Sequence, residues 1–174
     1  AINIGYIGHL YPGKGGELIV NVAKRMPDLD FHIVGGREQD ISRLKTQTLP
    51  PNLYLHGHHP YSETKKFLAA FDMVLAPYSQ KVQLAKTDAD IGRWMSPLKI
   101  FEYMSAQKAI IASNLTVLKE VLEHGKNALL ANPDDPDDWV EKIQSLAENP
   151  SLKLQIAQHA FNDFEKNDTW DKRA

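Results

Sequence analysis

The first residues with a chemical pattern form a glycine-rich turn near the amino terminus. Gly8-His-Leu-Tyr-Pro-Gly13-Lys14-Gly15 follows a strand-like segment and precedes a helix-period one, so its amides and the helix amino terminus could hold a phosphate. A nucleoside triphosphatase loop needs Ser or Thr after its lysine to bind Mg²⁺, and this chain has Gly15 there. The pattern disfavours that enzyme class and leaves two interpretations open, a phosphate-holding turn and a plain connection.

A second pattern lies in the segment Ser96-Pro-Leu-Lys99-Ile-Phe-Glu102. Pro97 suits the first position of a helix and places Ser96 near its cap. The exposed amides and Lys99 would favour an anion, and Glu102 lies one turn further on, within reach of a hydroxyl-rich group. The alternative is a solvent-facing Lys99–Glu102 pair, which would contribute only about 0.2–0.5 kcal/mol.

Other clusters of polar residues could in principle bind a metal ion. His56-Gly-His58-His59 has no nearby carboxylate at a helpful spacing, so solvated or capping histidines are favoured. Asp88-Ala-Asp90 resembles a metal-clamping pair but lies in an irregular segment, and a metal role there is disfavoured. The acidic run 134–138 is interpreted as helix capping. The chain has no Cys, which excludes thiolate zinc sites, and we predict no metal site.

Length and composition limit the broad class of protein. The chain has 174 residues, 43% of them hydrophobic, and a net charge of −2, which indicates one globular domain rather than a disordered or coiled-coil chain. Without a basic excess, non-specific nucleic-acid binding is disfavoured. No apolar run is long enough to span a membrane. Because the chain begins without Met and directly on a strand-like segment, we expect it to be a piece of a longer protein.

Short apolar segments alternate with helix-period segments along the whole chain. This alternation predicts an α/β fold with a doubly wound, parallel, six-stranded, Rossmann-like sheet, whose ligands bind beyond the carboxyl ends of the strands. The pattern fails only over residues 79–95, which we expect to be mobile without ligand and to order against one. The predicted strands are 2–7, 31–34, 53–56, 73–76, 109–112 and 128–131. Helices are expected around 18–26, before Pro50, after a cap at Ser62, at 97–107, at 117–124 closed by Gly125, around 139–147 and around 156–164.

The run Pro97-Leu-Lys-Ile-Phe-Glu-Tyr-Met-Ser-Ala-Gln-Lys-Ala-Ile-Ile-Ala-Ser113 resembles the signature of family 4 (group 1) glycosyltransferases. Three further landmarks follow the order of that family: 6–10 with Lys14-Gly15, 33–36, and 127–130 with Pro133 and Asp135. The resemblance covers nearly the whole chain. It implies that residues 1–174 form the C-terminal, donor-binding half of a two-domain GT-B architecture, whose N-terminal acceptor domain is absent from this chain.

The resemblance also implies roles for individual residues. Lys14 and Glu102 are the expected catalytic residues, Lys14 on the donor diphosphate and Glu102 on the ribose hydroxyls. His9 stands where the family usually has Arg, and Trp94 stands where the first Glu of its E-x7-E pair would be. The expected substrate-binding residues are Gly8, His9, Gly15, Arg93, Trp94, Ser96, Pro97, Leu98 and Lys99.

The function implied by the resemblance is half of a retaining hexosyltransferase that takes a sugar from a nucleotide-diphosphate sugar, without a metal ion or cofactor. The acceptor would be a polysaccharide or a lipid-linked saccharide of bacterial surface polysaccharide synthesis. The location would be cytoplasmic, with attachment to the inner membrane face through the missing domain, and the isolated chain would be inactive. A non-catalytic nucleotide or sugar-phosphate binding module remains the alternative.

Overall fold

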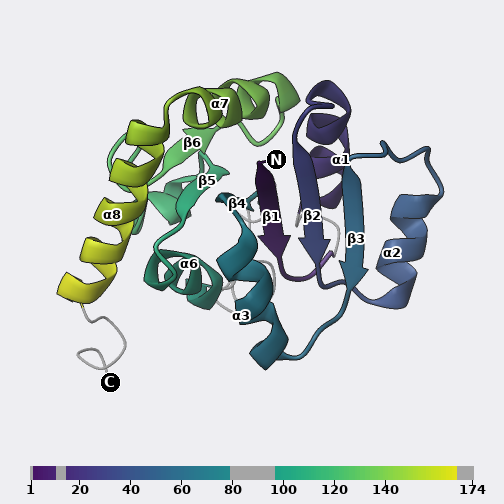
Figure 1. Cartoon of the computed structure of the whole chain (residues 1–174), viewed down its shortest axis with the longest axis horizontal. Helices are drawn as coiled ribbons and strands as arrows, with labels where there is room; N and C mark the ends of the chain where they lie inside the picture. Colours follow the sequence, from purple (N-terminus) through teal and green to yellow (C-terminus); the bar gives the residue numbers. More distant parts are fainter. Residues whose placement is uncertain (1, 11–14, 79–96, 168–174) are drawn as a thin grey trace.

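A computed structural model of the chain describes residues 2–10, 15–78 and 97–167. Its centre is a six-stranded sheet in the order β3-β2-β1-β4-β5-β6, in which every neighbouring pair is parallel (Figure 1). The strands are β1 Asn3–Ile7, β2 Asp30–Val34, β3 Leu53–Gly57, β4 Met73–Ala76, β5 Ala109–Ser113 and β6 Leu129–Ala131. The predicted doubly wound parallel sheet is confirmed.

Helices cover both faces of this sheet. The helices are α1 Gly16–Arg25, α2 Glu38–Lys45, α3 Tyr61–Ala70, α6 Pro97–Ser105, α7 Pro136–Glu148 and α8 Pro150–Asn167, with a 3₁₀ helix η1 at Thr116–Glu120. One core joins α1, α2 and α7 to the sheet, the other joins α3 and α6, and α8 contributes to both. Alternate residues of a strand enter opposite cores, as Met73 and Val74 do on β4. Burial on both faces explains why the strands are continuous apolar runs in the sequence.

Two local predictions are wrong. The helix expected at 117–124 is only the 3₁₀ helix η1, and Gly125 closes no helix, because its amide donates to the Ala128 carbonyl in a turn. The side chain of Asn127 accepts a bond from the Glu123 amide and donates to the Val121 carbonyl, which satisfies this segment without a further helical turn. Ser62 is likewise not a cap, since α3 begins at Tyr61 and extended Pro60 precedes it.

The acidic run before α7 caps that helix as predicted. The Asp135 carboxylate accepts a hydrogen bond from the Asp137 amide at 3.0 Å, and Pro136 occupies the first helical turn. In the described part of the chain, no helix is long and apolar enough to cross a membrane. The predicted mobile segment 79–95 lies outside the described residues.

Candidate functional site

The carboxyl ends of β1 and β4 lie side by side where the strand order changes direction. Such switch points are where open α/β sheets bind ligands. Gly8 follows β1 directly, and its amide donates to the Val34 carbonyl at 2.9 Å. Gly15 precedes α1 with φ +91°, and a Cβ there would lie 2.1 Å from the Pro77 carbonyl oxygen. Both glycines therefore allow close backbone approach at this edge.

Lys99, in the first turn of α6, reaches under the Gly8 turn. Its Nζ donates to the carbonyl of Ile7, the last residue of β1. The same Nζ lies 5.7 Å from the centroid of the Tyr6 ring. A Cβ built on Gly8 would lie 2.5 Å from the Lys99 Nζ, so glycine is needed for the amine to sit there. The fold thus holds a lysine amine directly beneath the turn that was predicted to hold a phosphate.

Burial lowers the pKa of Lys99 to about 8, although the nearby Glu102 carboxylate acts to raise it. The cause is desolvation, which disfavours the ammonium form of a half-buried lysine. An anion bound next to the amine would replace the lost hydration and favour the charged form again. The electrostatics of this position therefore favour a negatively charged ligand.

Glu102 does not form the surface ion pair that was the alternative interpretation. The Lys99 amine bonds to the Ile7 carbonyl instead, and within residues 2–10, 15–78 and 97–167 no cation forms an ion pair with the Glu102 carboxylate. Glu102 is half-buried and its side chain lines a pocket between α3 and α6. A half-buried carboxylate without an ionic partner can accept hydrogen bonds from a ligand.

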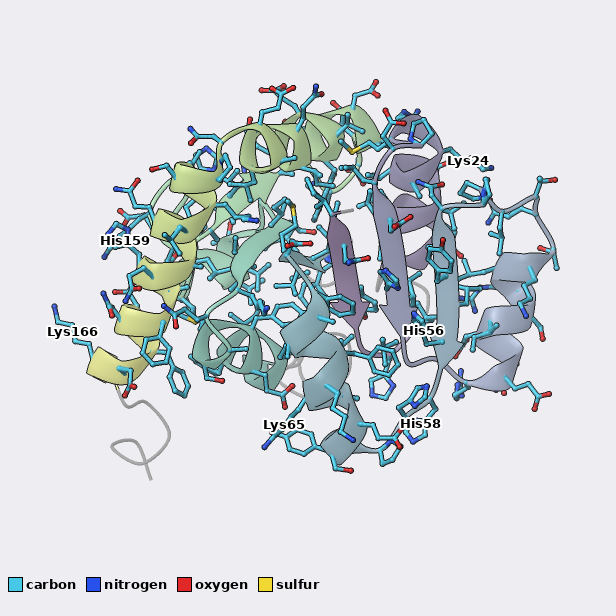
Figure 2. The ribbon with its side chains drawn as sticks, viewed as in Figure 1. Lys24, His56, His58, Lys65, His159 and Lys166 are labelled. Carbon is cyan, nitrogen blue, oxygen red and sulfur yellow. The ribbon has the colours of Figure 1, made fainter. Side chains whose placement is uncertain are left out.

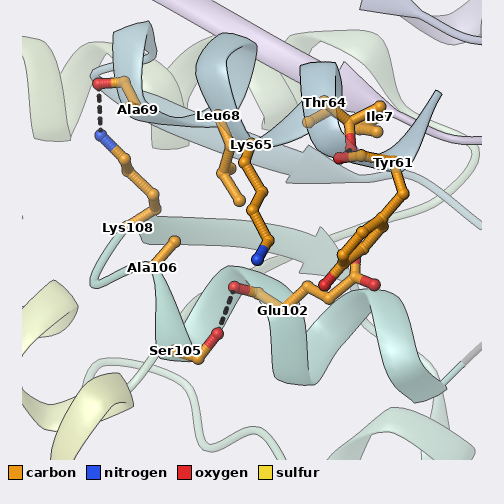
Figure 3. Close-up of a pocket in the computed structure, with 10 residues that line it drawn as sticks. All are labelled: Ile7, Tyr61, Thr64, Lys65, Leu68, Ala69, Glu102, Ser105, Ala106 and Lys108. Atoms are coloured by element: carbon orange, nitrogen blue, oxygen red, sulfur yellow. Dashed lines mark hydrogen bonds between the residues drawn. The ribbon is translucent and has the colours of Figure 1, made fainter. Parts of the chain in front are cut away.

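The pocket beside Glu102 has a volume of about 430 Å³ (Figure 3). This is within the range of about 300–1,000 Å³ typical of small-molecule sites. Ile7, the residue before Gly8, lines it, and so does Tyr61, which is 61% exposed. The lining residues are Ile7, Tyr61, Thr64, Lys65, Leu68, Ala69, Glu102, Ser105, Ala106 and Lys108.

Sequence reasoning missed the contribution of α3 to this pocket. Tyr61, Lys65 and Ala69 recur every four residues and form one stripe of the helix. That spacing was the only available signal, and in a polar helix it also fits an ordinary solvated face. The packing of α3 beside α6 is what turns the stripe into a wall of the pocket.

The remaining predicted site residues divide into two groups. His9 is exposed, and its carbonyl accepts a 2.6 Å hydrogen bond from the buried Tyr6 hydroxyl. Pro97 and Leu98 lie in the first turn of α6, as predicted, but only their backbone is described. The predictions for Lys14, Arg93, Trp94 and Ser96 lie outside the described residues, as does the Asp88–Asp90 pair.

Two of the three histidines at the end of β3, His56 and His59, have partners within the protein. His56 Nε2 lies 2.9 Å from His32 Nδ1, and His59 Nδ1 lies 2.8 Å from the Glu63 carboxylate. Figure 2 shows His56 and His58 near the carboxyl end of β3. Burial lowers the pKa of both His32 and His56. Among the residues that the structure describes, no three His, Asp or Glu side chains are grouped so as to hold a metal ion.

A family model described as "Glycosyl transferases group 1" matches residues 1–149. An uncharacterised glycosyltransferase of Methanocaldococcus jannaschii is 24% identical over 169 residues, which cover 96% of this chain and 44% of that protein. The putative teichuronic acid biosynthesis glycosyltransferase TuaH of Bacillus subtilis is 28% identical over 116 residues, covering 66% of this chain and 27% of TuaH.

The fold is similar to that of HepE from Anabaena, solved in complex with UDP-glucose. The TM-score is 0.78 at 21% identity, and the match covers 95% of this chain and 44% of that structure. The chain therefore spans less than half the length of each of these three proteins.

Proposed function

The chain belongs to the glycosyl transferases of group 1, and on this premise we propose that it binds the nucleotide-diphosphate sugar that donates the sugar in glycosyl transfer. The main observation behind the proposal is that Lys99 and Glu102, three residues apart on α6, do not pair with each other. One turn of α6 presents an amine under the Gly8 turn and, in the adjoining pocket, a carboxylate that forms no ion pair within the described residues. A nucleoside diphosphate requires this pair of groups, a cation for its phosphates and an acceptor for its ribose hydroxyls.

In the proposed complex the diphosphate lies over the Gly8 and Gly15 backbone, beside Lys99 at the amino terminus of α6, and Lys14 is the second lysine proposed to contact it. The Glu102 carboxylate accepts hydrogen bonds from the ribose hydroxyls. His9 stands where related enzymes usually have Arg, so Lys99 supplies the second positive charge from beneath the turn. The complex of HepE with UDP-glucose supports a donor of this class.

The proposed chemistry is cleavage of the bond between the sugar and the diphosphate, with retention of configuration at the sugar. Negative charge develops on the leaving diphosphate, and Lys14, Lys99 and the amides of α6 stabilise it. These groups supply the neutralisation that a divalent cation gives elsewhere, so we propose transfer without a metal ion or cofactor.

The proposal also covers the family, the domain division and the acceptor of the whole enzyme. We assign the chain to family 4 as the C-terminal half of a GT-B hexosyltransferase, with the acceptor bound by an N-terminal domain. The chain's span of less than half of those relatives supports this division. The name of TuaH supports a surface polysaccharide or lipid-linked acceptor at the cytoplasmic face of the membrane. The chain alone is then expected to bind donor without transferring sugar.

The test is calorimetric titration of the chain with UDP in EDTA. We expect binding without added metal, and we expect Glu102→Gln to weaken it by about tenfold to a hundredfold, the effect of losing hydrogen bonds to a charged group. Glu120→Gln, at an exposed position of η1 away from the pocket, is the matched control and should bind as the wild type does. Binding that requires Mg²⁺, or an unchanged dissociation constant for Glu102→Gln, would contradict the proposal.

A further inference from the structure

The pocket beside Glu102 lies between α3 and α6, and a second charged side chain, that of the exposed Lys65, also lines it. Lys65 Nζ lies 5.1 Å from the centroid of the Tyr61 ring, one turn earlier on α3. Across the described part of the chain, no carboxylate forms an ion pair with Lys65. Figure 3 shows its amine pointing into the space between the two helices. The amine is therefore available to a ligand that enters the pocket.

The groups that line the pocket are arranged in order from the Ile7 end to the Lys108 end (Figure 3). Ile7 lies at one end, next to the Gly8 turn, and the Glu102 carboxylate extends toward this end (Figure 3). The Lys65 amine lies further along the pocket, on the side of Ala106 and Lys108 (Figure 3). Lys108 itself is occupied, because its Nζ donates to the carbonyls of Ala69 and Phe71 at the end of α3. Among the described residues that line the pocket, Lys65 is thus the cation that remains open to a ligand on this side of Glu102.

This order matches the parts of a nucleoside diphosphate. With its phosphates at Gly8 and its ribose at Glu102, the base would enter the space between α3 and α6. The buried side chain of Leu68 and the small side chain of Ala106 offer an apolar surface to a flat ring, and Tyr61 offers an aromatic one. The edge of the base farthest from the ribose would then face Lys65.

We propose that Lys65 selects nucleotides whose base carries a keto oxygen at the edge farthest from the ribose. This assignment rests on the proposed function, because it requires the ribose to lie at Glu102. An ammonium group donates hydrogen bonds and accepts none. Uracil and guanine present an acceptor oxygen at that edge, whereas cytosine and adenine present an amino group, which is itself a donor. The donor class is then a uridine or guanosine diphosphate sugar.

The experiment compares UDP, GDP, CDP and ADP by calorimetry on the wild type, Lys65→Met and Lys66→Met. Lys66 is the next residue of α3 and is exposed as Lys65 is, but it lines a different depression, with His59 and Phe67, and so controls for loss of charge. We expect the wild type to prefer UDP and GDP. Lys65→Met should weaken those two by about tenfold, the contribution of one charged hydrogen bond, and leave CDP and ADP unchanged. Lys65→Arg, which keeps a charged donor, should retain the preference.

Two results would overturn the assignment while leaving the proposed function standing. Equal weakening of all four nucleotides by Lys65→Met would mean that the amine acts only as a general charge. Identical binding by Lys65→Met and Lys66→Met would mean that Lys65 does not contact the base. If the wild type binds none of the four nucleotides, the proposed function itself fails and the assignment fails with it. Thermal melting of each variant distinguishes lost contacts from lost structure.

Discussion

Raising the pH from 7.5 to 9.5 should stabilise the fold and weaken diphosphate binding at the same time. Both effects come from Lys99, whose pKa burial lowers to about 8 from its ordinary value of 10.5. Between these two values the unfolded chain holds a proton on Lys99 that the folded chain has lost. Because the unfolded state then binds more protons, stability rises with pH in this window.

The size of the stability effect follows from the two pKa values. With a folded pKa of about 8 and an unfolded one of 10.5, the free energy of unfolding rises by about 2 kcal/mol between pH 7.5 and 9.5. Burial raises the pKa of Tyr6 and Tyr103, so both hydroxyls stay protonated in the folded state. Their contribution has the opposite sign but becomes substantial only from about pH 10. Burial also lowers the pKa of Lys108, which adds a rise of the same sign. Lys99→Met should therefore remove the part of the rise that comes from Lys99.

The effect on binding has the opposite direction. The protonated fraction of Lys99 falls from about three quarters to a few per cent over this range, so UDP affinity should fall by up to about twentyfold if only the ammonium form binds. Urea unfolding and calorimetry at both pH values measure the two effects. Lys119→Met, at an exposed lysine of η1, is the control and should follow the wild type.

Two separate results would refute this reasoning. If the stability of the wild type and of Lys99→Met depends on pH in the same way, the Lys99 amine is not desolvated in the folded state. If stability rises as expected but UDP affinity stays constant, the amine does not contact the diphosphate. The pH dependence thus tests the position of Lys99 and its role independently.

Three further predictions concern the scaffold around the site. Gly15→Ala should lower the free energy of unfolding in urea by more than about 2 kcal/mol. The reason is that φ is +91° and the new Cβ would lie 2.1 Å from the Pro77 carbonyl oxygen. An unchanged unfolding midpoint would mean that the turn relaxes freely. Asn52→Ala should cost about 2–3 kcal/mol in the same assay, since the buried Nδ2 donates to the carbonyls of Ala23, Met26 and Leu29 at 3.0, 2.9 and 2.8 Å. Stability should also fall as the pH drops from 7 to 5, because burial lowers the pKa of His32 and His56 and the unfolded chain takes up protons first. A His56→Gln variant that keeps the full wild-type slope in a pH series of melting curves would count against this origin.

The strands could be predicted from the sequence because their signal is local and strong. Each is a short apolar run that ends near Gly, Pro or a polar residue, and burial on both faces keeps the run unbroken. The helix expected at 117–124 shows the limit of such local reasoning. Leu118 and Leu122 have helical spacing and both are buried. However, the Asn127 side chain competes for the backbone groups of Val121 and Glu123, and that contact is invisible to periodicity.

A candidate site could be predicted from the sequence, but its contacts could not. The rule that ligands bind beyond strand ends favoured the Gly8 turn, and the helix-start pattern at Ser96 and Pro97 favoured the start of α6. The actual partner of Lys99 is the Ile7 carbonyl, 92 residues earlier in the chain. Only the packed sheet brings these groups together. Lys65 gave even less signal, because a lysine in a polar helix is normally solvated.

On an isolated helix, a lysine and a glutamate three residues apart attract each other and become each other's partner. In this fold the Ile7 carbonyl binds the lysine amine, and the glutamate points instead into the pocket between α3 and α6. The two charges still interact, since Glu102 acts to raise the pKa of Lys99, but neither neutralises the other. Each therefore keeps hydrogen-bonding capacity for a ligand, and the lost ion pair would have contributed only about 0.2–0.5 kcal/mol on a helix surface. The fold lacks the weak Lys99–Glu102 ion pair. The amine and the carboxylate are instead two separated groups that a nucleoside diphosphate can contact at the same time.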